Sequence, residues 1–191
     1  MKRLRTLAVL TSAFVLAACG GQSVWAPDTA VEQARIVTGE QPYLELKTMV
    51  SNTTGRGGHS SLLINGSQLV LWDPAGRWRH STAPERNDVV FGMTPALLAQ
   101  YDSWHARNTH HVVSQRIYVT PQVAEMAMQL AFNNGPSLDA HCAQTTSGIL
   151  QRLPGFEGIR STWYPHVLMA QFETLPSVET RRHYESDVGK N

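Results

Sequence analysis

The chain has 191 residues, with 16 Lys and Arg, 15 Asp and Glu, and a formal net charge of +1. Three of the basic residues and none of the acidic ones lie in the first 18 positions, so the remainder has 13 basic against 15 acidic residues. This balance argues against nucleic acid as a partner, because phosphate binding needs a basic surface.

The first 18 residues have the pattern of a secretory signal: a basic start, MKRLR, and an apolar run that is too short for a membrane span. The run closes with Leu16-Ala17-Ala18-Cys19-Gly20, which resembles the lipobox of bacterial lipoproteins. The resemblance implies cleavage before Cys19, lipidation (palmitate) of its thiol, and anchoring to a membrane that the chain does not span. Because Gly20 is not aspartate, it implies the outer membrane, facing the periplasm. An ordinary signal peptide with a chance cysteine is the alternative.

The organisation expected from these patterns is a single globular domain behind a short leader. We expect a signal peptide over 1–18, a lipidated tether over 19–40, one domain over 41–176, and a polar C-terminal tail over 177–191.

The first half of the domain has the pattern of strands. PYLELKTMV (42–50) predicts a strand, and 51–58 predicts a polar loop. Strands are predicted over His59–Ile64 and Gln68–Asp73, joined by the turn Asn65-Gly66-Ser67, and a short strand over 88–92. The joined pair is apolar on both faces, so we expect it to be central and covered on both sides.

The second half alternates helices with strands. Thr94-Pro95 and Thr120-Pro121 are helix starts, with threonine as N-cap and proline in the first turn. Between these helices 111–119 predicts a strand. Further helices are predicted over 141–153, with Asp139 as cap, and from Tyr164-Pro165, and one more strand near 178–184. The order predicts an α+β domain in which helices pack on an antiparallel sheet.

The turn length decides which residues of the hairpin face each other. If the loop is Asn65, Gly66 and Ser67, His59 lies directly opposite Asp73. A two-residue loop would put Trp72 there and turn Asp73 to the other face. A carboxylate bonded to the imidazole would hold its tautomer and leave the second nitrogen as a base. The alternative is a structural hydrogen bond, or Asp73 capping the turn that follows it.

With Cys19 assigned to lipid, Cys142 is the single remaining thiol, so an internal disulfide is excluded. Its position at the start of the helix over 141–153 favours the thiolate, which is the nucleophilic form. A buried cysteine acting as a small apolar residue is the alternative. No HxxxH or CxxC spacing indicates a metal site, and we expect no cofactor.

Two segments together resemble the NlpC-like superfamily of papain-fold cysteine hydrolases. GHSSLLINGSQLVLWDPAG (58–76) is similar to its histidine-strand segment and HCAQTTSGIL (141–150) to its cysteine helix. Because His59 precedes Cys142, the chain resembles the circularly permuted branch, which includes lipoproteins and enzymes acting on amide, ester or thioester bonds. The resemblance implies a permuted papain-like architecture with Cys142 as nucleophile, His59 as general base and acid, and Asp73 as the orienting residue.

Other histidines near these segments are alternatives for a role in the site. His80 is the substitute for Asp73, and His141 is adjacent to the cysteine and so placed to perturb its pKa. The expected function is a cell-envelope lipoprotein that hydrolyses an amide bond, such as that of a peptidoglycan stem peptide. A non-catalytic binding module, or an acyltransferase or thioesterase using the same residues, is the alternative.

Overall fold

The computed structural model describes residues 23–190, so the expected signal peptide, lipobox and Cys19 lie outside the described residues. Seven strands form a single antiparallel sheet in the order β4-β5-β3-β2-β1-β6-β7. They are β1 (Tyr43–Ser51), β2 (Gly57–Asn65), β3 (Leu69–Trp72), β4 (Glu85–Arg86), β5 (Val89–Val90), β6 (His110–Tyr118) and β7 (Glu179–His183).

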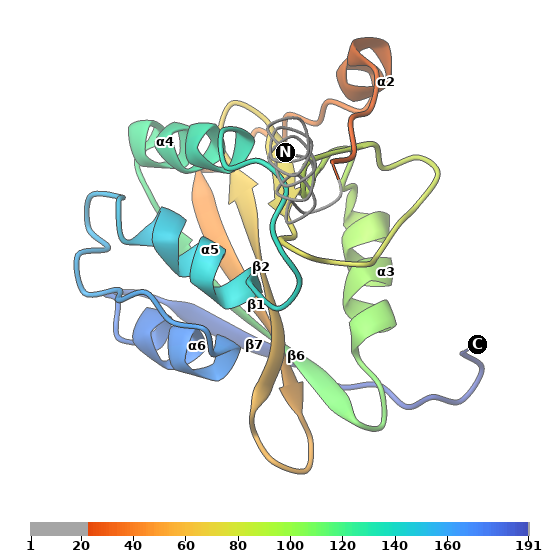
Figure 1. Ribbon diagram of the computed structural model, residues 1–191, viewed down its shortest axis with the longest axis vertical. Coiled ribbons are helices and arrows are strands. Elements are labelled where there is room, and N and C mark those ends of the chain that lie inside the picture. Colours follow the sequence, from red (N-terminus) through yellow and green to blue (C-terminus); the bar gives the residue numbers. More distant parts are fainter. Residues whose placement is uncertain (1–22, 191) are drawn as a thin grey trace, which may run out of the picture.

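Helices cover both faces of this sheet (Figure 1). The helix α3 (Pro95–His105) lies on one face, and α4 (Pro121–Phe132), α5 (Cys142–Leu150) and α6 (Pro165–Glu173) lie on the other. A short helix, α2 (Asp28–Gln33), precedes the sheet. The α+β prediction, with helices packed on an antiparallel sheet, is confirmed.

The hairpin of β2 and β3 separates two hydrophobic cores. Leu62, Ile64 and Trp72 pack under α4, α5 and α6, whereas Leu63 and Leu71 pack under α3. All five side chains are buried, as the alternation of strand side chains requires when both faces are covered. The prediction of a central hairpin covered on both sides is therefore confirmed.

Two of the predicted helix starts are confirmed by their capping bonds. The Thr94 hydroxyl accepts from the Leu97 N–H at 3.2 Å, and the Thr120 hydroxyl accepts from the Val123 N–H at 3.3 Å. Each bond satisfies a first-turn N–H that the helix itself leaves unpaired.

The predicted cap of α5 is wrong. This helix begins at Cys142 with His141 as its N-cap residue, and none of the described side chains caps it. Asp139 lies too far upstream, because Ala140 adopts a positive φ of 65° and turns the chain before the helix begins. The first-turn N–H groups of α5 are consequently left without a side-chain acceptor.

The hairpin register differs from the prediction by two residues. The loop has three residues, but they are Gly66, Ser67 and Gln68, because Asn65 pairs with Leu69 and Leu62 with Trp72. Continued by one residue, this register places Asp73 opposite Ser61 rather than His59. A shift of two keeps every side chain on its face, so His59 and Asp73 remain diagonal neighbours on the same side of the sheet.

Segments near both ends of the described residues contribute to the sheet edges. Trp25, within the expected tether, forms a bridge to Arg86 of β4. At the opposite edge β7, within the expected tail, pairs with β6. Among residues 23–190, no helix combines the length and apolarity needed to cross a membrane.

Close contact between β2 and the start of α6 yields a first prediction, on Gly57. A Cβ added there would lie 2.6 Å from the His166 backbone nitrogen and 2.7 Å from Pro165 Cβ. Gly57→Ala must therefore push α6 away from the sheet, and we expect it to lower the free energy of unfolding by about 1–3 kcal/mol. Urea denaturation monitored by circular dichroism measures this loss.

The neighbouring glycine gives a matched control. A Cβ on Gly58 would meet no atom closer than 3.7 Å, from His110 Nε2. Gly58→Ala should unfold near the wild-type midpoint, and equal destabilisation by the two substitutions would contradict the proposed close packing.

Candidate functional site

The imidazole of His59 and the carboxylate of Asp73 form a hydrogen-bonded pair. His59 Nε2 lies 2.7 Å from Asp73 Oδ1, and the Asp73 side chain is almost fully buried. Strand β3 ends just before Asp73, whose N–H donates to the Asp88 carbonyl at 2.8 Å, while the Gly76 N–H donates to the Asp73 carbonyl at 2.9 Å. This turn holds the carboxylate diagonally across from His59, so the pair forms despite the shifted register.

Tyr101 of α3 adds a second hydrogen bond to the same carboxylate oxygen. Its hydroxyl oxygen lies 2.8 Å from Asp73 Oδ1 and 2.9 Å from Ser61 Oγ, and its side chain is fully buried. Because a carboxylate only accepts, the phenol proton is donated to Asp73, and the Ser61 hydroxyl donates to the Tyr101 oxygen. Sequence reasoning missed Tyr101, because an aromatic residue within a helix is by default a core residue.

The thiol of Cys142 lies at the sheet edge that β3 leaves open. Pairing between β2 and β3 stops at Leu62 and Trp72, and the backbone N–H groups of Ser60 and Ala143 reach the sulfur and favour its anionic form. Cys142 itself is 5% exposed. The start of α5 and the open edge of β2 thus meet at the sulfur atom.

His59 is the strongest influence on the thiol besides burial. Burial raises the pKa of Cys142, but the hydrogen bond and positive charge of His59 bring that pKa below its usual value. Because Nε2 of His59 is bonded to Asp73, Nδ1 is the ring nitrogen that this bond leaves available. The predicted trio of Cys142, His59 and Asp73 is therefore contiguous in the structure.

The charges of the trio support one another. Burial lowers the pKa of His59, but the Asp73 carboxylate, with help from the Cys142 thiolate, raises it to about 10. Burial likewise raises the pKa of Asp73, and the His59 charge and the Tyr101 hydrogen bond bring it below its usual value. The charged forms of the three groups, namely the thiolate, the imidazolium and the carboxylate, therefore favour one another.

A second histidine, His105 of α3, lies against the His59 ring. The two rings are nearly parallel, with centroids 5.8 Å apart, and His105 Nδ1 donates to the Tyr101 carbonyl at 2.9 Å. Burial lowers the pKa of His105 to about 4, so this ring is neutral at physiological pH. The neutral ring of His105 therefore covers one side of the His59 ring and does not take up a proton in its place.

The other histidines suggested by the sequence lie outside the trio. His80 Nδ1 lies 3.0 Å from the Thr82 hydroxyl and its ring stacks on Trp78, so Asp73 and not His80 is bonded to His59. His141 precedes Cys142 and contacts the exposed ring of Trp163 edge-on, with centroids 4.5 Å apart. Within residues 23–190 no group of three or more His, Cys, Asp or Glu side chains is arranged to hold a metal ion.

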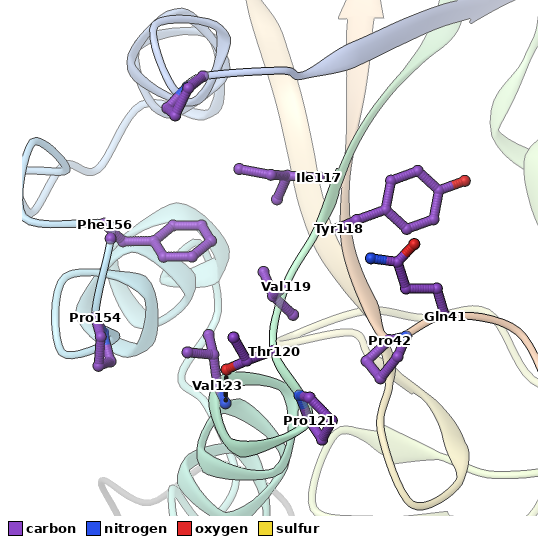
Figure 2. Close-up of a pocket in the computed structure, with 12 residues that line it drawn as sticks. Gln41, Pro42, Ile117, Tyr118, Val119, Thr120, Pro121, Val123, Pro154 and Phe156 are labelled. Carbon is purple, nitrogen blue, oxygen red and sulfur yellow. Dashed lines mark hydrogen bonds between the residues drawn. The ribbon is translucent and has the colours of Figure 1, made fainter.

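A groove lies at the far end of the sheet. It has a volume of about 710 Å³, and Ile117, Val123 and Phe156 approach it from three different elements (Figure 2). Its strand residues pair with the start of β1 at Tyr43, whereas His59 pairs with Met49 near the end of β1. At roughly 3.4 Å per residue the two places are about 20 Å apart along the strand, so the groove is separate from the trio.

Comparisons with known proteins give no relative for this chain: no family model, no curated protein and no solved structure matches it.

The pKa shifts predict an unusual titration of the thiol. Since the pKa of Cys142 is lowered, its thiolate should form at a lower pH than the thiolate of a free model thiol does. Since the pKa of His59 is raised to about 10, the imidazolium should persist until the pH approaches that value. Alkylation of Cys142 should therefore be faster than that of the model thiol at neutral pH, and thiolate absorbance should show the lowered pKa. His59→Ala should raise the pKa of Cys142. An unchanged titration of this thiol in the variant would contradict an ion pair between Cys142 and His59.

The Tyr101 hydroxyl gives a separate prediction about how the trio is held. Tyr101→Phe removes the second donor to Asp73 and leaves the buried Ser61 hydroxyl without its acceptor. We expect about 1–3 kcal/mol loss of stability and a several-fold slower alkylation of Cys142 at neutral pH. Tyr184→Phe, on an exposed tyrosine, is the control and should change neither quantity. If Cys142 in the Tyr101→Phe variant is alkylated at the wild-type rate, Asp73 does not need the hydrogen bond from Tyr101.

Proposed function

We propose that this protein is a thiol hydrolase with a permuted papain-like architecture, in which Cys142 is the nucleophile, His59 the general base and acid, and Asp73 the orienting residue. The observation that carries this proposal is the contiguous series from the buried Asp73 carboxylate through His59 to Cys142. A structural hydrogen bond explains the His59–Asp73 pair alone, but it does not explain a thiol with a lowered pKa at the other side of the ring.

The geometry supports acyl transfer in two steps. The Cys142 thiolate attacks the carbonyl carbon of the substrate, and the resulting oxyanion is stabilised by N–H groups of the uncapped first turn of α5. His59 gives its proton to the leaving amine, the carbon–nitrogen bond breaks, and an acyl-enzyme thioester remains. Water then attacks this thioester while His59 takes its proton, which releases the acid and restores the thiolate.

The proposed setting is the cell envelope. The lipobox resemblance at Cys19 suggests a lipoprotein of the outer membrane that faces the periplasm. The amide bonds of peptidoglycan stem peptides are the abundant substrates of matching chemistry in that compartment, and we propose a bond of this kind as the target.

A second candidate is acyl transfer or thioester hydrolysis by the same trio. The observation that favours it is an exposed aromatic surface beside the cysteine, where Trp163 contacts His141 and Tyr164 follows in the chain. Such a surface suits an apolar acyl group. Peptide and acyl substrates differ in the group attached to the carbonyl, so product analysis separates these two candidates, and absence of turnover favours a binding module.

The experiment is digestion of purified peptidoglycan and of acyl-thioester and acyl-ester substrates by the full chain, with mass spectrometry of the products. Wild type should release products from one of these classes, and Cys142→Ala should abolish release because the nucleophile is lost. His59→Ala should reduce turnover by about 100-fold or more, in line with the usual contribution of general acid–base catalysis.

His80→Ala is the matched control, because His80 lies in the loop that follows Asp73 but its ring bonds to Thr82 and not to the trio. It should retain wild-type turnover. A folded Cys142→Ala variant with unchanged product release would contradict the proposed nucleophile.

A further inference from the structure

The described chain begins fixed to one edge of the sheet. The Ala26 N–H donates to the Glu85 carbonyl, and the Asn87 N–H donates to the Val24 carbonyl, each at 2.9 Å. The Ser23 hydroxyl also lies 3.0 Å from the Asn87 side-chain oxygen. The segment Ser23–Ala26 therefore lies along β4 as an outermost strand, and the backbone has no freedom to act as a long tether from Ser23 onward.

This attachment leaves a short connection to the proposed lipid anchor. Three residues separate Cys19 from Ser23, and four successive residue steps extend at most about 14 Å. If Cys19 carries acyl chains, it lies at the bilayer interface, where the headgroup layer is itself about 5–7 Å thick. The outer edge of the sheet then lies within about 14 Å of the lipidated residue.

The side chains at this edge suit that surface. Trp25 is 63% exposed, and the guanidinium of Arg86 lies over its ring, 4.8 Å from the centroid. Indole is favoured at membrane interfaces because it is apolar with one polar N–H. The charges beside it are compensated, since Arg86 pairs with Asp28 and Glu85 pairs with Arg79 at 2.9 Å.

We propose that the edge formed by Ser23–Ala26 and β4, which we call the membrane-facing edge, docks on the lipid headgroups of the bilayer that holds the anchor. The proposal depends on the lipidation at Cys19 that belongs to the proposed function. Because the charges at the edge are compensated, docking does not require anionic lipid.

The sheet then sets the distance of the site from the bilayer. Trp25 bridges Arg86, Arg86 pairs with Val89, and Val89 pairs with Trp72, which directly precedes Asp73. Three strand spacings of about 4.8 Å place Asp73 roughly 15 Å from the membrane-facing edge. Added to the short connection of about 14 Å, this keeps Asp73 within about 30 Å of Cys19, so the substrates within reach are those held near the bilayer surface.

The test uses the full lipidated chain in vesicles of zwitterionic phosphatidylcholine, with brominated acyl chains as quenchers of tryptophan fluorescence. Wild type should be quenched, and Trp25→Ala should lose most of the quenched signal. Trp104→Ala is the control, because Trp104 is also exposed (45%) but lies on α3. Trp104→Ala should keep the quenching. Equal quenching in Trp25→Ala and Trp104→Ala would overturn the proposal.

A flexible insertion tests the short connection independently. Twenty Gly and Ser residues placed between Gln22 and Ser23 should reduce the quenching of Trp25 by severalfold, because the domain is then free to leave the surface. Unchanged quenching with the insertion would mean that the connection is not what holds the edge to the bilayer. If chemical cross-linking shows Trp25 buried against a second copy of the chain and shielded from the quencher, the bilayer is the wrong partner.

Two further measurements separate this proposal from the enzymatic one. Cys142→Ala should dock as wild type does, because the nucleophile takes no part in docking. Quenching of the wild type without turnover by the wild type would contradict the hydrolase and leave docking supported. Mass spectrometry of the mature N-terminus reports acylation of Cys19. A Cys19 without acyl chains would overturn docking, whereas turnover by Cys142 would be judged separately from the digestion products.

Discussion

The site depends on one buried carboxylate. Asp73 Oδ1 accepts from His59 on β2 and from Tyr101 on α3, so a single oxygen atom joins the sheet to the helix layer. A buried carboxylate is unfavourable unless it is paired and hydrogen-bonded, and His59 and Tyr101 both bond to this one. The same pairing holds the His59 ring in one orientation and keeps it protonated, which in turn favours the thiolate of Cys142.

The point at which β3 ends allows the thiol, which comes from the opposite helix layer, to lie near His59 and so near this carboxylate. His59, Ser61 and Asp73 share the face that α3 covers, whereas α5 packs on the other face. Because β3 stops at Trp72, the backbone of Ser60 is available to the sulfur at the edge of the sheet. A longer β3 would have covered this edge and separated Cys142 from His59.

The hairpin shows how much of the site was predictable. The alternation of side chains placed His59 and Asp73 on one face, and this survived an error of two residues in the register because the period of a strand is two. The cap of α5 was not predictable from Asp139, since the positive φ of Ala140 ends the preceding turn and starts the helix later. Tyr101 gave no local signal, because its role exists only through contact with β2 and the turn after β3.

The sequence by itself determined the α+β class, the two threonine-capped helix starts, the central hairpin, and the presence of one free thiol near a helix start. These are local properties, set by periodicity, capping and composition. The tertiary structure alone decided which atoms meet: the diagonal pair of His59 and Asp73, the second hydrogen bond from Tyr101, and the open sheet edge that receives Cys142. Those contacts join segments up to 83 positions apart, and they follow from where β3 ends and how α3 and α5 pack, which no short stretch of sequence encodes.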